Sequence, residues 1–126
     1  MSMGIGVPLF RTIEAKTADY RCTYLDSGKI LTNRGAAGAV TITLPPTADI
    51  PTGWWIEVFV AAGQNLTVAS NTVDTMVVFN DATADSIAFS TANELIGNGA
   101  RFVWDGTGWL TFVALGAETA TPTIAT

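Results

Sequence analysis

The segment Val40–Leu44, with the sequence VTITL, alternates apolar side chains with threonine. A period of two is typical of a β-strand that buries one face, because successive side chains of a strand point to opposite sides. Gly35 and Gly38 precede this segment and two prolines follow it, and both residue types mark turns. We therefore expect a turn, a half-buried strand and a stop, with the three apolar side chains in the core.

Further segments of this kind recur along the chain at the spacing of an all-β sandwich or barrel. They are WWIEVFV, QNLTVAS, TMVVF, SIAF and ARFVW. The last is followed by the loop Asp105–Gly108 and another apolar segment, which predicts a hairpin with Trp104 and Trp109 opposite each other. Helix signals are weak because threonine, valine and glycine are frequent, and only a single helical turn is expected, at residues 94–96.

The segment WWIEVFV carries large apolar groups on both of its faces. Ile56, Val58 and Val60 share one face, while Trp55 and Phe59 share the other with a glutamate between them. Such a strand either lies between two layers of the domain or turns one face toward another subunit.

These patterns predict an all-β chain with a single domain, an antiparallel β-sandwich or a jelly-roll-like barrel. Residues 1–18 are expected to form an extended N-terminal arm, because two glycines and a proline near the start disfavour a helix. Residues 19–116 are then the sandwich domain, and residues 117–126 a C-terminal tail or an edge strand. The N-terminus lacks the pattern of a signal peptide, and no apolar segment is long enough to predict a membrane span.

The chain carries a formal net charge of −5, from 11 acidic and 6 basic residues. An acidic surface repels a phosphate backbone, so we expect no nucleic-acid partner. The basic residues are scattered along the sequence and predict no basic patch.

The sequence contains no histidine, which removes the commonest general base and the Ser-His and Cys-His pairs of nucleophilic catalysis. We therefore expect no enzyme and assign no catalytic residue, metal or cofactor. Asp74, Asp81 and Asp85 could hold calcium or hydrolyse a glycoside, but they do not follow the pattern of a calcium loop. Their plainer interpretation is that they end strands and solvate loops. Cys22, the single cysteine, is interpreted as a structural thiol.

The glycine-rich loop Asn33–Gly38 raises the question of phosphate binding. A nucleotide-binding loop would continue with a lysine and a helix, whereas here a strand pattern follows. We therefore interpret the loop as a structural turn.

The four tryptophans could form a stacking surface for sugars or bases. Trp54, Trp104 and Trp109 lie within or beside predicted strands, so packing in the core or an interface explains them. Trp55 is the candidate for an exposed aromatic residue that contacts a partner.

The run DSGKILTNRGAAGAVTITLP, followed by QNLTVAS, VDT and the closing DGTGW, resembles small virion proteins and virion domains of tailed bacteriophages. That group includes capsid decoration (cement) proteins, head-fibre proteins and modules of tail fibres, which are generally β-rich and often trimeric. The resemblance implies structural work on a virus particle, with no catalytic residues to carry over. It favours a decoration protein that binds the major capsid protein on the outer surface of the head as a homotrimer.

Two sets of residues are assigned to this function. Val7, Leu9 and Phe10 are expected to contact the capsid, because an extended apolar arm can fold onto a partner surface. Trp55 and Phe59 are expected to form the trimer interface.

An alternative is a head-fibre or tail-fibre module that binds a glycan of the host surface. It would use Trp55 together with the loop carboxylates Asp81 and Asp85. A third possibility, a depolymerising enzyme, rests on the aspartates alone.

Overall fold

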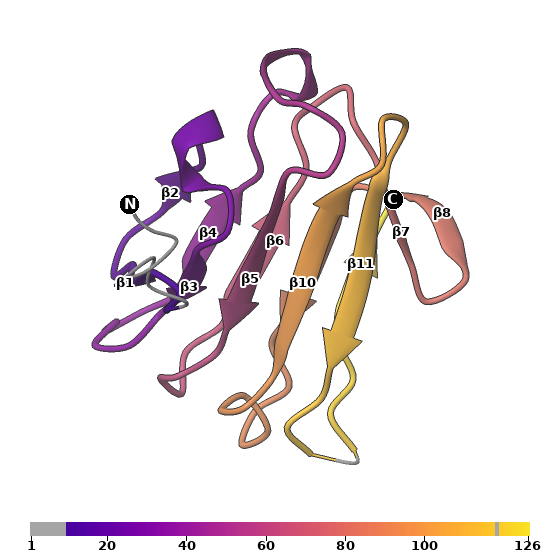
Figure 1. Ribbon diagram of the computed structural model, residues 1–126. Helices are drawn as coiled ribbons and strands as arrows, with labels where there is room; N and C mark the ends of the chain where they lie inside the picture. Colours follow the sequence, from indigo (N-terminus) through magenta and orange to yellow (C-terminus); the bar gives the residue numbers. More distant parts are fainter. Residues whose placement is uncertain (1–9, 118) are drawn as a thin grey trace.

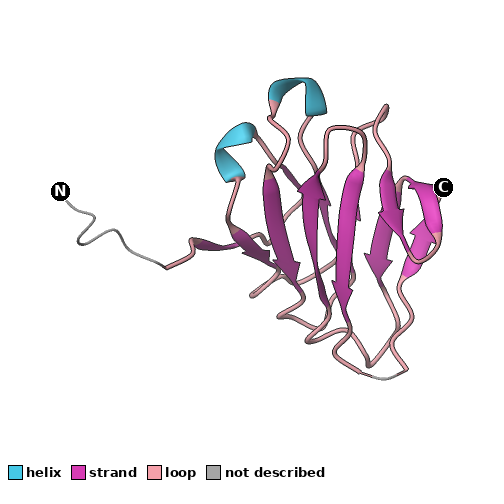
Figure 2. Ribbon diagram, turned by 45° about the vertical axis from the view of Figure 1, so that its right-hand side comes forward, coloured by secondary structure: helices cyan, strands magenta, loops and turns pink. Residues whose placement is uncertain are grey.

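The computed structural model describes residues 10–117 and 119–126. These residues form two β-sheets packed against each other, with two short 3₁₀ helices at one end of the sandwich (Figures 1 and 2). The larger sheet has the strand order β1 (Ile13–Ala15), β3 (Ile30–Thr32), β5 (Trp55–Phe59), β10 (Gly99–Trp104), β11 (Trp109–Ala114), β7 (Met76–Val78) and β8 (Asp81–Ala84). The smaller sheet has the order β12 (Thr123–Ala125), β9 (Ser86–Phe89), β6 (Leu66–Ala69), β4 (Val40–Thr43) and β2 (Tyr20–Arg21), and the helices are η1 (Tyr24–Asp26) and η2 (Thr47–Asp49). The predicted all-β sandwich is confirmed.

Strand pairing differs from the expected antiparallel arrangement, because both sheets are mixed. In the larger sheet β1, β3 and β5 are parallel neighbours, and in the smaller sheet β2, β4 and β6 are parallel neighbours. The chain crosses to the other sheet after each strand from β1 to β6. Neighbours within one sheet are therefore two strands apart in sequence and run in the same direction. Each antiparallel pair includes a strand from β7 onwards.

The space between the sheets is filled by apolar side chains from alternating strand positions. The three apolar side chains of Val40–Leu44 are at most 1% exposed, which confirms the predicted core face of that segment. Trp109 is fully buried, and its ring centroid lies 5.6 Å from that of Trp54 and 5.5 Å from that of Trp104. Trp104 and Trp109 are directly opposite each other in the β10–β11 hairpin, as predicted.

The predicted helical turn at residues 94–96 is wrong, because this segment is a loop. It ends at Gly97, whose φ of +99° lies outside the helical region, and the Asn98 side chain closes the loop by donating to the Glu94 carbonyl at 2.7 Å. The helical turns lie elsewhere. In η1 the Thr23 side chain accepts from a helical backbone N–H, and Asp26 accepts from the Thr23 N–H at 2.9 Å, which is a capping box.

The two ends of the described chain are paired with the sheets. Residues 10–18 fall in the expected arm and contain β1, which pairs with β3 at the edge of the larger sheet. At the other terminus β12 pairs with β9 at an edge of the smaller sheet. Within the described ranges, no helix has the length and apolar character needed to cross a membrane.

Candidate functional site

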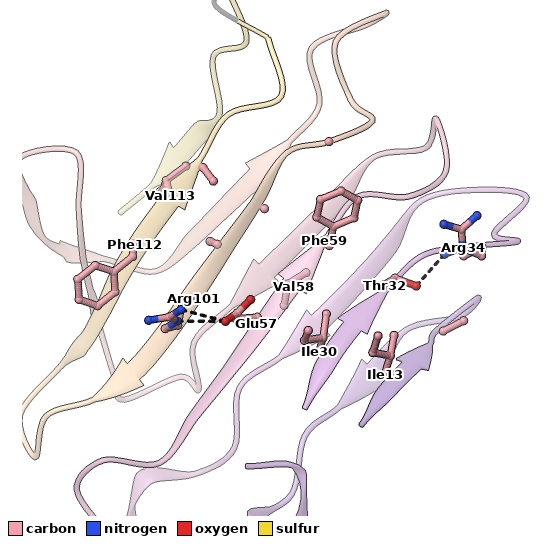
Figure 3. A pocket seen from close by; sticks show the side chains of 15 residues that line it. Ile13, Ile30, Thr32, Arg34, Glu57, Val58, Phe59, Arg101, Phe112 and Val113 are labelled. Carbon is pink, nitrogen blue, oxygen red and sulfur yellow. Dashed lines mark hydrogen bonds and ion pairs between the residues drawn. The ribbon is translucent and has the colours of Figure 1, made fainter. Parts of the chain in front are cut away.

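An open groove of about 800 Å³ lies on the outer face of the seven-stranded sheet (Figure 3). Its lining comes from β1, β3, β5, β10, β11 and the loops next to them, and most of its side chains are apolar. Phe59 on β5 and Phe112 on β11 lie on either side of β10, where the lining includes Gly99. The groove therefore has two aromatic walls and small residues on part of its floor.

The groove is apolar because the strands place apolar side chains at their outward positions as well as their inward ones. On β5 the inward residues Ile56 and Val58 are at most 2% exposed. Trp55 is half-buried on the opposite face, and Phe59 there is 43% exposed. The two residues that sequence analysis assigned to a trimer interface thus lie together on the outer face of one strand.

Phe112 is an exposed aromatic residue of the groove that sequence analysis did not assign. It is 57% exposed and is paired in register with Arg101, which in turn is paired with Glu57. The sequence WLTFVA contained the information needed to place Phe112. If Trp109 points into the core, alternation puts Leu110, Phe112 and Ala114 on the outward face.

Two arginines on this face share one carboxylate. The Glu57 carboxylate accepts hydrogen bonds from Arg101, with Nη2 at 3.1 Å and Nε at 3.2 Å, and is also bound by Arg11. Burial alone would raise the pKa of Glu57, but hydrogen bonds from the two arginines outweigh it and lower the pKa. Both guanidinium groups also lie over the Trp55 ring, at 4.7 Å and 5.7 Å from its centroid. Trp55 is therefore partly covered by cations of its own chain.

Gly99 permits the close approach of β5 and β10 in the groove floor. A Cβ at this position would lie 2.5 Å from the Val58 carbonyl oxygen and 3.6 Å from Cδ2 of Phe59. We expect Gly99→Ala to lower the free energy of unfolding by about 2 kcal/mol, because the backbone must move to relieve the overlap. Gly38→Ala is the matched control, since a Cβ there meets no atom within 4 Å. Equal urea midpoints for the two variants would contradict this prediction.

The residues assigned to capsid contact are only partly described by the structure. Val7 and Leu9 lie outside the described residues. Phe10 is described and is 90% exposed, two residues before Thr12, whose carbonyl accepts from the Ile30 N–H at 2.9 Å. The described part of the predicted contact is thus an exposed aromatic side chain next to the edge of the sheet.

The residues of the glycan-binding alternative are not brought together. Trp55 is on β5 and Asp81 on β8, with β10, β11 and β7 between them, which is about 19 Å at the usual spacing of strands. Asp81 accepts from the Thr83 N–H at 2.9 Å and from the Thr126 hydroxyl at 2.6 Å, and these bonds lower its pKa. Asp81 and the exposed Asp85 therefore form no single site with Trp55.

The carboxylates also form no metal site in the part of the chain that the structure describes. No group of three or more His, Cys, Asp or Glu side chains that could hold an ion occurs there. Asp74 accepts from the Thr47 hydroxyl at 2.8 Å through Oδ1, while its Oδ2 is buried with no partner among the described residues.

The loop Asn33–Gly38 is a corner that leads into β4, as predicted. Gly35 adopts a φ of +83°, which favours glycine. The fully buried Asn33 side chain accepts from the N–H groups of Ala61 and Ala62, each at 2.8 Å, and donates to the carbonyl of Ala62 at 3.2 Å. These bonds fasten the loop to the segment after β5, so its polar groups are used in holding the fold.

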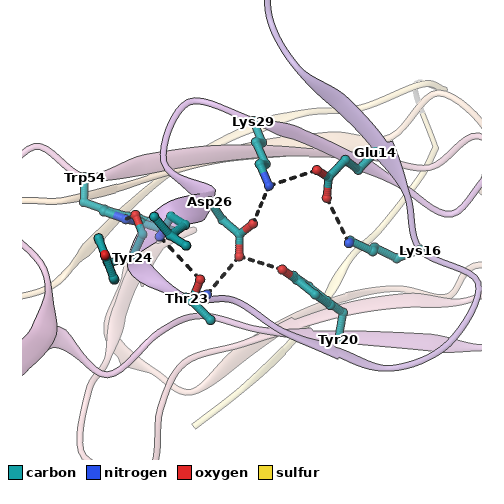
Figure 4. A network of polar contacts seen from close by, with 9 residues as sticks. Glu14, Lys16, Tyr20, Thr23, Tyr24, Asp26, Lys29 and Trp54 are labelled. Carbon is teal, nitrogen blue, oxygen red and sulfur yellow. Dashed lines mark hydrogen bonds and ion pairs between the residues drawn. The ribbon is translucent and has the colours of Figure 1, made fainter.

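A second polar cluster joins the first strand to η1 (Figure 4). Asp26, 1% exposed, accepts from the Tyr20 hydroxyl at 2.8 Å and from Lys29 at 2.9 Å. Lys29 also binds Glu14 on β1 at 2.9 Å, and Glu14 binds Lys16 at 2.9 Å. We call these five residues the polar ring, because the Lys16 ammonium returns to the Tyr20 ring at 3.7 Å from its centroid. The ring bridges the two sheets at the edge where β1 and β2 lie.

Cys22 is buried next to this cluster, with 2% of its surface exposed. Burial raises the pKa of its thiol to about 12, and the nearby Asp26 carboxylate acts in the same direction. The thiol is therefore protonated at neutral pH, which suits a structural role.

In comparisons with known proteins, no family model matches the chain, and no curated protein matches it. One feature of the described surface is a mostly apolar groove, in which Glu57 is paired with Arg11 and Arg101.

Proposed function

We propose that this chain is a capsid decoration protein of a tailed bacteriophage, which binds the outer surface of the assembled head as a homotrimer and stabilises it. The observation that carries the proposal is the apolar groove on the outer face of the seven-stranded sheet. A mostly apolar exposed surface suits association with protein, because its burial removes apolar area from water. The resemblance of the sequence motifs to phage virion proteins supplies the kind of partner, the major capsid protein.

The proposed stabilisation is thermodynamic. A protein that binds the assembled shell and not the free subunits stabilises the shell by mass action, by about 2.7 kcal/mol per site at a free concentration 100 times the Kd. A trimer that contacts neighbouring capsid subunits gains further, because the second and third contacts form at a high effective concentration.

Within this proposal Trp55 and Phe59 lie at the contact between copies, and Val7, Leu9 and Phe10 contact the capsid. The exposed Phe10 and the position of Phe59 on the groove wall support these assignments. Their large apolar side chains are of the kind that contribute most to protein interfaces.

The test is binding to heads that have been stripped of surface proteins. Full-length protein and a variant lacking residues 1–10 are incubated with expanded heads, with unexpanded heads and with free capsid subunits, and bound protein is measured by sedimentation. We expect saturable binding of the full-length chain to expanded heads and weaker binding of the variant.

Two results would contradict the proposal. The absence of binding to any head would exclude decoration. Binding to host glycans, with only a few copies of the chain per virion, would support the fibre module instead. If the shortened variant bound as tightly as the full chain, only the assignment of the arm would be wrong.

A further inference from the structure

The β7–β8 hairpin presents an aromatic side chain in an unusual way. Figure 1 shows it standing out from the side of the sandwich opposite β1 and β2. Its turn contains Phe79 with a φ of +45° and Asn80 with a φ of +64°. Asparagine tolerates the left-handed region, whereas a bulky residue there is rare and marks a constraint worth explaining. Phe79 is nevertheless 54% exposed, so burial in its own chain does not account for it.

The β7–β8 hairpin and the groove carry different charged side chains. The hairpin with its flanking residues, 74–85, carries Asp74, Asp81 and Asp85 and no lysine or arginine. The groove carries Arg34 and Arg101 in its lining. Glu57 also lines the groove and is bound by Arg11, so three arginines and one glutamate give the groove a net charge of +2. The hairpin and the groove are therefore opposite in charge.

We propose that the β7–β8 hairpin of one copy docks into the groove of the next copy, with Phe79 between the walls formed by Phe59 and Phe112. The groove volume of about 800 Å³ is large enough for an aromatic side chain and the turn that carries it. The acidic residues of the hairpin then lie near the arginines of the groove. This inference rests on the self-association contained in the proposed function.

The contact has a direction, which limits the assemblies that it can form. Hairpin and groove are different surfaces of one chain, so the contact is head to tail, and a ring such as a trimer forms when the rotation between copies closes. A contact of two grooves with each other would bring together two surfaces of the same charge sign and leave Phe79 exposed. Charge complementarity thus favours the second copy's hairpin as the occupant of the groove.

The test uses two variants that each damage one half of the contact. Phe79→Asn removes the aromatic side chain and suits the left-handed backbone, so the thermal midpoint should be unchanged or higher. Ala114→Glu places a negative charge on an exposed position of the groove lining. Each variant should weaken self-association about tenfold or more, as measured by sedimentation velocity, because each removes a central part of the contact. Leu25→Ser is the control, since Leu25 is 69% exposed on η1, away from both surfaces.

Mixing the two damaged variants gives the decisive result. In a head-to-tail contact the Phe79→Asn copy keeps an intact groove and the Ala114→Glu copy keeps an intact hairpin, so the mixture should form a heterodimer. The inference would be overturned if Phe79→Asn associated as strongly as the wild type. It would also be overturned if the mixture stayed monomeric although each variant retained its thermal midpoint. A monomeric wild type at micromolar concentration would also overturn it. Binding of the wild type to expanded heads is measured in a separate experiment. The inference about the hairpin can therefore fail while the proposed decoration function stands.

Discussion

Trp109→Ala is expected to lower the free energy of unfolding by about 3–5 kcal/mol, which is a large share of the stability of an ordinary domain. Trp109 is fully buried and contacts the rings of Trp54 and Trp104. Its removal would leave a cavity between the sheets and would break both aromatic contacts. Urea unfolding followed by far-ultraviolet circular dichroism measures the change, because the midpoint of the transition can be compared between variants even where the folded signals differ.

Trp109→Phe is the matched variant for this prediction. The indole N–H of Trp109 is buried with no hydrogen-bond partner among the described residues, so phenylalanine removes an unsatisfied donor while it keeps an aromatic ring. We expect it to lose less than half of the stability that the alanine variant loses. A loss below 1 kcal/mol for Trp109→Ala would show that the tryptophan cluster is not central to the core.

Asp26→Ala is expected to lower the free energy of unfolding by about 3 kcal/mol, since it breaks a buried ion pair and a capping box together. Asp26 is 1% exposed and accepts from the Thr23 N–H, the Tyr20 hydroxyl and the Lys29 ammonium. Its loss would leave the Tyr20 hydroxyl without its acceptor and Lys29 with Glu14 as its remaining carboxylate partner. The same unfolding measurement applies.

The pH dependence of stability gives an independent test of the polar ring. Burial would raise the pKa of Asp26, but hydrogen bonds from Thr23, Lys29 and Tyr20 lower it, and hydrogen bonds from Lys29 and Lys16 lower the pKa of Glu14. Below about pH 4–5 the unfolded chain takes up protons before the folded chain does, so stability should fall there as the pH decreases. Hydrogen bonds from Glu14 and Asp26 raise the pKa of Lys29, so its contribution is complete below about pH 10 and is lost at higher pH.

Asp26→Ala should therefore show a smaller loss of stability between pH 5 and pH 3 than the wild type, in addition to its lower stability at pH 7. Asp49→Ala is the control, because Asp49 is an exposed carboxylate of η2 and its replacement should change stability by less than about 0.5 kcal/mol. If stability fell by the same amount between pH 5 and pH 3 in Asp26→Ala and in the wild type, the assigned role of Asp26 would be contradicted.

Local patterns in the sequence predicted several strands well. The period of two located β4, β6, β9 and β10, and the loop Asp105–Gly108 located the hairpin that joins β10 to β11. The strands β2 and β3 were missed because two and three residues carry too little periodicity, and β8 was missed because alanine is its only apolar residue type. The helical turn expected at residues 94–96 was wrong, since the tertiary contacts of Asn98 and Gly97 hold a loop there.

The candidate site was predicted in part. The alternation in WWIEVFV placed Trp55 and Phe59 on the face opposite the core, and both lie on the outer face of the sheet. The same alternation could have placed Phe112, but its proximity to Phe59 depends on the pairing of β5, β10 and β11. The glycan-binding set of Trp55, Asp81 and Asp85 could not be judged without the strand order, which separates them.

The sequence by itself determined which residues of a strand share a face, because successive side chains point to opposite sides whatever the strand pairs with. It also determined the acidic charge and the absence of histidine. The tertiary structure alone decided that neighbours among the first six strands are parallel and that the groove and the acidic β7–β8 hairpin lie apart on one chain. Strand partners depend on how the chain crosses between the sheets, so residues far apart in sequence meet or separate through contacts that no local pattern encodes.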